Sequence, residues 1–322
     1  MISTSAEYDR VIQENRDMQV GDVITLGDGN QITLDNSKVL SYVIKDATSA
    51  DGVFEIGSAI AKQHTFTLAN VNRTYDRVQL GGAQVDAKIK VQLSETVEVI
   101  RKGIFYITKA YRKGKTMVCE AYDGMVKFNR PYSESGLEYP ATVNEIISGA
   151  CLDCGVLLNA ATVENGNYII QARPEDESIT YRDVIAYCAQ LMGKYAKIDT
   201  EGVLFFGWYN FDAFITGITD GGWFDEDSPY SSGITLDCGT FNPWNNPAGY
   251  DAGTFEDMKQ MHHFQHVRSE QINENDVVVT GIKVTTETEE IQYGDNGYVL
   301  EISENPFIED GKASEVAQYL GG

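Results

Sequence analysis

Ile104-Phe105-Tyr106-Ile107-Thr108-Lys109-Ala110-Tyr111-Arg112 and Thr116-Met117-Val118-Cys119-Glu120-Ala121-Tyr122 stand on either side of the turn residues Lys113-Gly114-Lys115. Both runs are rich in β-branched and aromatic residues, and apolar and polar side chains alternate along them. A period of two is typical of a strand that buries one face. This stretch therefore predicts a β-hairpin, and it sets the class of the N-terminal part of the chain.

Shorter runs with the same alternation precede the hairpin. One of them is His64-Thr65-Phe66-Thr67-Leu68-Ala69-Asn70, and Asp28-Gly29 is a strong turn signal between two others because both residues tolerate positive φ. Closely spaced strands with Gly, Asn and Asp between them are typical of an antiparallel barrel or sandwich. Residues 1–129 are therefore predicted to form one β domain, with further strands at 23–26, 31–34, 39–45, 63–70 and 87–93.

Two capping boxes mark helices in the next part of the chain. Thr142 with Glu145, and Thr180 with Asp183, have the three-residue spacing of this motif. Apolar residues recur at helical spacing after each box, and a glycine follows each run where a helix end is expected. Residues 130–210 are predicted to form a small α/β domain with two helices on a small sheet.

Residues 211–260 differ in composition, with nine aromatic residues, nine acids and one base. Three copies of Asp-x-Gly-x-Phe recur here at short spacing, which predicts an insertion of stacked turns or hairpins that share a buried aromatic stripe. A glycan-stacking surface is the alternative use of these rings. The repeat residues are Asp220, Gly222, Phe224, Asp237, Gly239, Phe241, Asp251, Gly253 and Phe255.

Residues 261–322 return to a β pattern. Strands are expected at 277–287 and 298–302, with a turn at 295–297 and a short helix at 314–320. No strand is visible after that helix. This part is predicted to be a second β domain that is incomplete at its C-terminus.

Size and cysteine usage limit the class of protein. With 322 residues and 35.7 kDa, the chain is long enough for two or three domains. The first residues lack the apolar core of a signal peptide, and no run approaches the ~18 apolar residues of a membrane span. Five scattered cysteines are typical of free thiols made in a reducing cytosol. We expect synthesis in a cytoplasm and no membrane anchor.

Negative charge is concentrated toward the C-terminus. The net charge is −23, and residues 211–322 hold 21 acids against four bases. Binding nucleic acid requires Lys and Arg for the phosphates, so specific nucleic-acid binding is not expected. An acidic surface also lets nucleic acid pass without adhering, because like charges repel. Solubility alone is the competing explanation.

No motif makes a positive case for an enzyme, a cofactor or a metal. Cys151 and Cys154 have CxxC spacing, but both fall on the apolar stripe of the first expected helix, which favours buried structural cysteines. His262 and His266 lack the glutamate of a His-Glu-x-x-His site. The repeated aspartates lack the alternate oxygen ligands of a calcium loop.

Four blocks of sequence, in order, resemble the baseplate hub or tail-associated protein of long-tailed bacteriophages, of the type found in phages and prophages of Gram-positive bacteria. No single block is specific, but the ordered set is, and it covers most of the chain. The blocks are Phe54-Glu55-Ile56-Gly57-Ser58-Ala59-Ile60 with the strand to Asn70, Tyr122-Asp123-Gly124-Met125-Val126-Lys127-Phe128 to Arg130-Pro131-Tyr132, the segment 180–208, and Tyr298-Val299-Leu300-Glu301-Ile302 with Asn305-Pro306-Phe307-Ile308.

The resemblance implies a virion structural protein at the tail tip. It implies a homotrimer in which each subunit has two β-barrel-like hub domains, so that a pseudo-sixfold ring meets a hexameric tail tube or distal tail protein. Further implied partners are the tape-measure protein and a C-terminal spike or hydrolase. A glycan-binding or cell-wall-hydrolysing tail-tip protein is the alternative function.

Part of the acidic excess is expected to line the channel through which DNA leaves the tail during genome ejection. An acidic wall repels phosphates most strongly within a Debye length of ~8 Å at physiological salt. Because side chains alternate along strands, only some of the acids can face inward. The candidates are Glu287, Glu289, Glu290, Asp295, Glu301 and Glu304.

Overall fold

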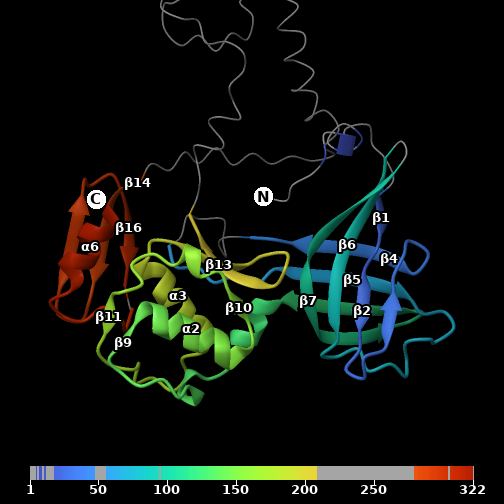
Figure 1. The fold of residues 1–322 in the computed structure, drawn as a ribbon, viewed down its shortest axis with the longest axis horizontal. Helices are drawn as coiled ribbons and strands as arrows, with labels where there is room; N and C mark the ends of the chain where they lie inside the picture. The colour runs from blue at the N-terminus through green and yellow to red at the C-terminus, as the bar shows by residue number, and fades with distance from the viewer. Residues whose placement is uncertain are drawn as a thin grey trace, which may run out of the picture. The chain divides into compact units, whose positions relative to one another are not determined.

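The computed structural model describes residues 5, 7–8, 11, 18–47, 56–93, 96–208, 279–303 and 305–321. Apart from residue 11, these residues belong to one compact unit. They are mainly β, with α-helices at three places outside the N-terminal residues (Figure 1). The predicted β-rich class with a helical middle part is confirmed.

An eight-stranded antiparallel sheet forms the N-terminal part. The strand order is β3-β2-β6-β7-β8-β5-β4, and β1 pairs with β6. The strands are β1 (Met18–Val20), β2 (Val23–Thr25), β3 (Gln31–Thr33), β4 (Val39–Lys45), β5 (Gln63–Ala69), β6 (Gln84–Gln92), β7 (Val97–Lys113) and β8 (Thr116–Asp123).

The predicted hairpin is the centre of this sheet. In β7 and β8, Lys113 pairs with Thr116 at the turn and Phe105 pairs with Asp123 at the far end. Alternate residues such as Phe105 and Cys119 are fully buried in one core, as the period of two predicts. Strand β7 begins seven residues before the expected start because its first half also pairs with β6.

No sheet of the described residues closes into a barrel, since the end strands β3 and β4 are not paired with each other. A buried polar cluster connects strands that are not neighbours in this open sheet. The Asp22 carboxylate accepts hydrogen bonds from the Lys88 backbone N–H (2.8 Å) and the Tyr42 hydroxyl (3.2 Å). His64 Nε2 lies 3.2 Å from the same carboxylate, and His64 Nδ1 lies 3.1 Å from the Val43 carbonyl. This cluster links β6 to β4 and β5; barrel closure stays a prediction.

The middle part has the two predicted helices, α2 (Val143–Cys154) and α3 (Tyr181–Leu191), and both capping boxes are confirmed. Gly155, with φ 62°, ends α2 in the left-handed conformation that glycine favours. A three-stranded sheet of order β10-β13-β12 accompanies the helices. The remaining elements are β9 (Ala141–Thr142), β10 (Leu157–Leu158), β11 (Ile169–Ile170), β12 (Tyr195–Ile198), β13 (Val203–Gly207), η1 (Gly124–Phe128), η2 (Tyr132–Glu134) and η3 (Ala160–Thr162).

The C-terminal part is a three-stranded sheet of order β15-β14-β16 and one helix. Its elements are β14 (Val279–Thr285), β15 (Glu290–Gly294), β16 (Tyr298–Ile302) and α6 (Ala313–Gly321). The expected long strand 277–287 is shorter, since a turn follows β14 and leads into the unexpected β15. The buried side chains of β14, β16 and α6 belong to the same core as α2 and α3. The predicted domain boundaries stay predictions.

Several predicted features lie outside the described residues. They are the whole Asp-x-Gly-x-Phe insertion, the histidines at 262 and 266, and Glu304. Among the described residues, no helix has the length and apolar character needed to cross a bilayer.

Candidate functional site: the junction around helix α3

The N-terminal block lies along the edge of the small sheet. Residues 56–60 run parallel to β12, with the Gly57 N–H donating to the Lys194 carbonyl (2.8 Å) and the Ala196 N–H donating to the Ser58 carbonyl (2.8 Å). A segment that precedes β5 in sequence is therefore joined by backbone hydrogen bonds to a strand more than a hundred residues later.

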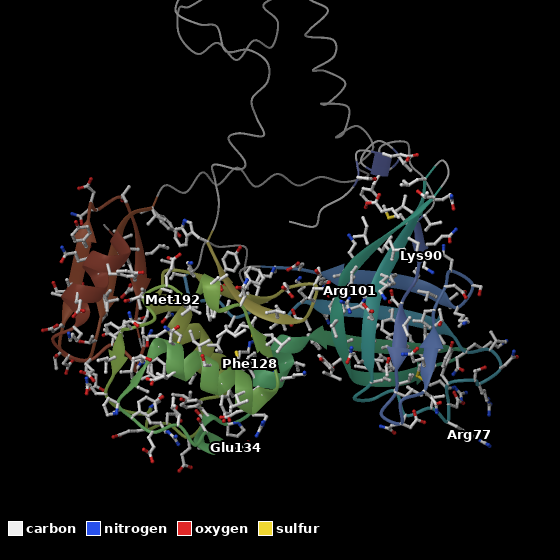
Figure 2. The ribbon with its side chains drawn as sticks, viewed as in Figure 1. Arg77, Lys90, Arg101, Phe128, Glu134 and Met192 are labelled. Atoms are coloured by element: carbon white, nitrogen blue, oxygen red, sulfur yellow. The ribbon has the colours of Figure 1, made fainter. Side chains whose placement is uncertain are left out.

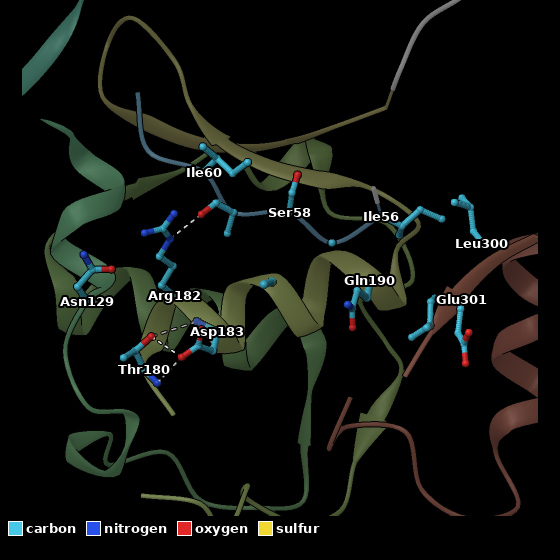
Figure 3. Close-up of a pocket in the computed structure, with 14 residues that line it drawn as sticks. Ile56, Ser58, Ile60, Asn129, Thr180, Arg182, Asp183, Gln190, Leu300 and Glu301 are labelled. Carbon is cyan, nitrogen blue, oxygen red and sulfur yellow. Dashed lines mark hydrogen bonds between the residues drawn. The ribbon is translucent and has the colours of Figure 1, made fainter. Parts of the chain in front are cut away.

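Helix α3 holds the other side of this segment. The Arg182 Nε donates to the Ala59 carbonyl at 2.6 Å (Figure 3). Gly57 has φ +85°, and a Cβ there would lie 2.0 Å from Gln190 Cγ and 3.0 Å from the Ala186 carbonyl oxygen. Both the left-handed backbone and the close approach to the helix require glycine at this position.

The second block contacts the start of α3. The Tyr132 N–H donates to the Ile179 carbonyl (2.8 Å), and the Tyr181 N–H donates to the Arg130 carbonyl (3.0 Å). The Tyr132 and Tyr181 rings meet edge to face at 5.1 Å. Tyr181 is fully buried, and its hydroxyl donates to the Asp153 carboxylate at 2.8 Å. The junction therefore ties the N-termini of η2 and α3 together.

Asp123 connects the first two blocks. Its carboxylate accepts from the Lys62 N–H and from the Met125 N–H, each at 3.1 Å, so it caps η1 and also holds the chain just before β5. Burial raises the pKa of Asp123 to about 6, although the two backbone N–H donors and the Lys62 charge act in the opposite direction. The carboxyl is 1% exposed, so desolvation of its charged form dominates.

The C-terminal block reaches the last turns of the same helix. The Asn305 side-chain amide donates to the Tyr187 carbonyl (3.2 Å) and to Gln190 Oε1 (2.8 Å). The fully buried Phe307 ring packs edge to face on Tyr187, with 5.8 Å between centroids. Gln190 therefore contacts the N-terminal block through Gly57 and the C-terminal block through Asn305.

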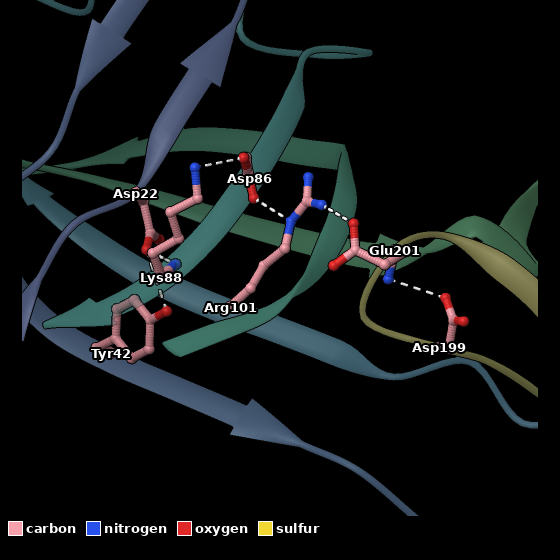
Figure 4. A network of polar contacts seen from close by, with 7 residues as sticks. All are labelled: Asp22, Tyr42, Asp86, Lys88, Arg101, Asp199 and Glu201. Atoms are coloured by element: carbon pink, nitrogen blue, oxygen red, sulfur yellow. Dashed lines mark hydrogen bonds and ion pairs between the residues drawn. The ribbon is translucent and has the colours of Figure 1, made fainter. Parts of the chain in front are cut away.

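Ion pairs connect the eight-stranded sheet to the hairpin β12–β13. Arg101 of β7 binds Asp86 of β6 at 2.7 Å and also pairs with Glu201 in the β12–β13 turn (Figure 4). Lys88 binds the second oxygen of Asp86 at 2.7 Å, and the Asp199 carboxylate accepts from the Glu201 N–H at 2.8 Å, which fixes the turn.

A second charged contact lies between the same two sheets. Asp46, just after β4, pairs with Lys62 before β5 (3.3 Å) and with Lys197 of β12. Both lysines are only 8% exposed, and each has the Asp46 carboxylate as its acidic partner. These contacts favour one arrangement of the two sheets.

A cavity of about 600 Å³ lies where the blocks meet. It is lined by residues of the segment 56–60, the first three turns of α3 and strand β16, and Ser58, Arg182 and Glu301 are among its polar groups (Figure 3). Of the described residues that line it, none is a histidine or a cysteine. The described side chains also form no group of three or more His, Cys, Asp or Glu that could hold a metal.

Cys151 and Cys154 are free and buried, as the sequence predicts. Burial raises the pKa of the Cys151 thiol to about 12 and that of the Cys154 thiol to about 11. A thiol that stays protonated at neutral pH is a poor nucleophile and a poor metal ligand. Both side chains pack in the core around α2 and α3.

The candidate channel acids do not form one continuous line. Glu290 and Glu301 share a face of the C-terminal sheet with Lys283, which binds them at 3.7 and 3.0 Å. Glu289 accepts from the Gly311 N–H at 3.2 Å. Exposed Glu287 and Asp295 lie in the two turns of the sheet.

Sequence reasoning did not single out the residues that make the junction. Gln190 and Asn305 carry no signal of their own in the sequence, because a contact between residues 115 positions apart leaves no local pattern. Two features of the sequence could have pointed to the junction. Gly57 is a glycine among apolar residues, and Asn305 precedes a proline, which is typical of a fixed turn.

No protein-family model matches the chain, and the curated proteins give no match. Among solved structures, the prophage MuSo2 43 kDa tail protein from Shewanella oneidensis is similar over 59% of this chain and 55% of its own, with 14% identity and a TM-score of 0.40. The tail protein from Neisseria meningitidis is similar over 94% of this chain and 74% of its own, with 12% identity and a TM-score of 0.44.

A PdpA–VgrG complex matches 89% of this chain and 48% of its own, at 12% identity and a TM-score of 0.40. This chain therefore spans about half the length of the Shewanella and VgrG-complex chains. At such low scores these likenesses establish neither a shared fold nor a shared function.

Proposed function

We propose that this chain is a structural hub of a phage or prophage tail tip, assembled as a homotrimeric ring. In this role it joins the tail tube or distal tail protein to the tip components and lets DNA and the tape-measure protein pass. Its location is the virion tail tip, after synthesis in the cytoplasm of the bacterial host.

One observation carries the proposal: the four blocks of the resemblance come together in space. The block 180–208 contains α3 and the strand that follows it, and the other three blocks, which lie on both sides of it in the sequence, all contact this helix or strand. A resemblance scattered over unrelated surfaces would be uninformative. A resemblance gathered at the place where the sheets are joined fits a protein whose task is to hold modules in a fixed arrangement.

The chemistry of the junction is consistent with a structural role. Its polar groups are used in internal hydrogen bonds: Arg182 binds a carbonyl, Asp183 closes a capping box, and Gln190 accepts from Asn305. Groups held in this way fix a geometry and are not poised for proton transfer to a substrate.

The acidic C-terminal part has a proposed role in ejection. Within the described residues 279–321 there are eight acids and two bases. If part of this charge lines the bore of the ring, phosphates pass a repelling wall and do not adhere to it. Exposed Asp295 is the strongest candidate because no described ion pair neutralises it.

The alternative is a glycan-binding or wall-hydrolysing protein, for which residues 211–260 supply the aromatic and acidic side chains. Two measurements separate the functions. The hub predicts a mass of three chains at micromolar concentration and no retention on cell-wall glycans. A mass of one chain together with specific glycan retention or hydrolysis would overturn the hub and support the alternative.

A further inference from the structure

A basic surface stands out on this very acidic chain. The loop 70–78 and the β7–β8 turn 111–116 together hold five bases and one acid, which is the reverse of the overall balance. We call them the basic end; the bases are Arg73, Arg77, Arg112, Lys113 and Lys115. All five are exposed, and Figure 2 shows Arg77 at an end of the eight-stranded sheet.

The two segments form one surface. The Asn70 N–H donates to the Lys115 carbonyl at 2.8 Å, and Arg112 binds the Asp76 carboxylate at 3.0 Å. Asp76 also accepts from the Asn70 side chain at 2.7 Å. The loop and the turn are thus held together before any partner arrives, which lowers the entropy cost of binding.

Much of the positive charge is unneutralised. Asp76 is used by Arg112, and among the described residues Arg73, Arg77, Lys113 and Lys115 have no ion pair. Exposed apolar side chains accompany them, since Val71 is 63% and Tyr111 40% exposed. Arg and Tyr beside apolar surface are enriched in protein–protein interfaces.

The complementary surface is present on the same chain. Around the β14–β15 turn lie Glu287, Glu289 and Glu290, with Glu309 and Asp310 beside them. The Thr286 hydroxyl donates to Asp310 at 2.8 Å, which holds these acids together. Hydrogen bonds from Thr288 and Thr286 lower the pKa of Asp310, so this carboxyl stays charged at neutral pH.

We propose that the basic end docks on the β14–β15 acidic turn of a second copy of this chain. Two different surfaces that meet between copies make a head-to-tail contact, and such a contact generates a ring when its rotation closes. The inference rests on the proposed function, because it names the surfaces through which the copies of the ring meet. A nucleic acid is the less favoured occupant, since the net charge of −23 repels phosphates at longer range.

Charge reversal and charge exchange test the contact. Lys113→Glu with Lys115→Glu reverses the basic end, and Glu287→Lys with Glu309→Lys reverses the acidic turn. These four side chains are exposed and make no hydrogen bond or ion pair with described residues, so each variant should fold, as circular dichroism will check. Lys45→Glu with Lys102→Glu changes the net charge by the same amount as the basic-end reversal, away from the basic end, and is the matched control for that variant.

Assembly is measured for the full chain by native mass spectrometry and sedimentation across a concentration series. Each reversed variant should dissociate at a concentration about tenfold or more above that of the unmodified chain, because like charges then face each other. The control should assemble normally. The variant with all four changes should regain assembly, since the two surfaces are again complementary.

Each other outcome overturns the proposed contact. If the unmodified chain assembles and the reversed variants do so equally well, the contact is wrong while the ring stands. If the unmodified chain stays a single copy throughout, the ring of the proposed function fails as well. If a labelled DNA duplex binds the unmodified chain and not the Lys113→Glu, Lys115→Glu variant, the basic end binds phosphates. The proposed docking on a second copy of the chain is then wrong.

Discussion

Replacing Gly57 by alanine perturbs the junction at the point where the N-terminal block meets α3. The new Cβ would lie 2.0 Å from Gln190 Cγ and 3.0 Å from a backbone carbonyl, at a φ of +85°. A non-glycine residue in the left-handed region costs about 1–2 kcal/mol. Gln190 must also move, which breaks its hydrogen bond with Asn305, worth about 0.5–1.5 kcal/mol. Together these give an expected loss of local stability of about 1.5–3.5 kcal/mol.

Gly82→Ala is the matched control for this change. Gly82 has φ +84°, and nothing lies within 4 Å of its Cβ position. The Gly82 variant therefore has the strain of a left-handed backbone without a clash between the new Cβ and a neighbouring side chain. Hydrogen exchange of the α3 amides and of residues 305–308 should be accelerated in the Gly57 variant and unchanged in the Gly82 variant. Equal exchange rates in the two variants would refute the close approach of the N-terminal block to Gln190.

The remaining predictions concern buried ionisable groups. Below pH 3.8 Asp123 is protonated in both the folded and the unfolded state. Between pH 3.8 and about 6 only the folded state keeps this proton. The contribution of Asp123 to the free energy of unfolding therefore falls by about 3 kcal/mol as the pH rises through this range. In urea unfolding, Asp123→Asn should lack that slope, and an unchanged slope would contradict the assignment. Asp22→Ala should cost about 3–5 kcal/mol because it leaves a buried histidine, a tyrosine hydroxyl and a backbone N–H without their acceptor, whereas Asp86→Ala, at a partly exposed ion pair, should cost about 1 kcal/mol or less. Similar costs would argue against the role of the Asp22 cluster in linking β6 to β4 and β5. Cys151 and Cys154 should resist a thiol reagent at pH 7 in native protein and react fully in denaturant; rapid native labelling would show that they are accessible.

Local signals in the sequence predicted most elements correctly. The period of two placed β4, β5, β7 and β8, and the two capping boxes placed the starts of α2 and α3, because each signal depends on neighbours in the chain. Strand β1 and the first half of β7 were missed. Their residues alternate less clearly, and their pairing with β6 is set by the sheet as a whole.

The site was harder to predict than the elements. The blocks were visible in the sequence, but their meeting around α3 depends on contacts such as Asn305 with Gln190, which no periodicity encodes. Strand β15 was missed for a related reason. Its polar residues, including Glu290 and Gln292, give little β signal, and the strand is held by its ladder with β14.

The proposed function requires that copies of this chain form a threefold ring. Electron microscopy of the full chain at micromolar concentration tests it most directly, because an obligate interface buries on the order of 2,000 Å² or more and should persist there. We expect closed rings with a central opening and threefold symmetry, each three times the 35.7 kDa mass of the chain. Single copies across the whole concentration range, or open filaments without a ring, would contradict it.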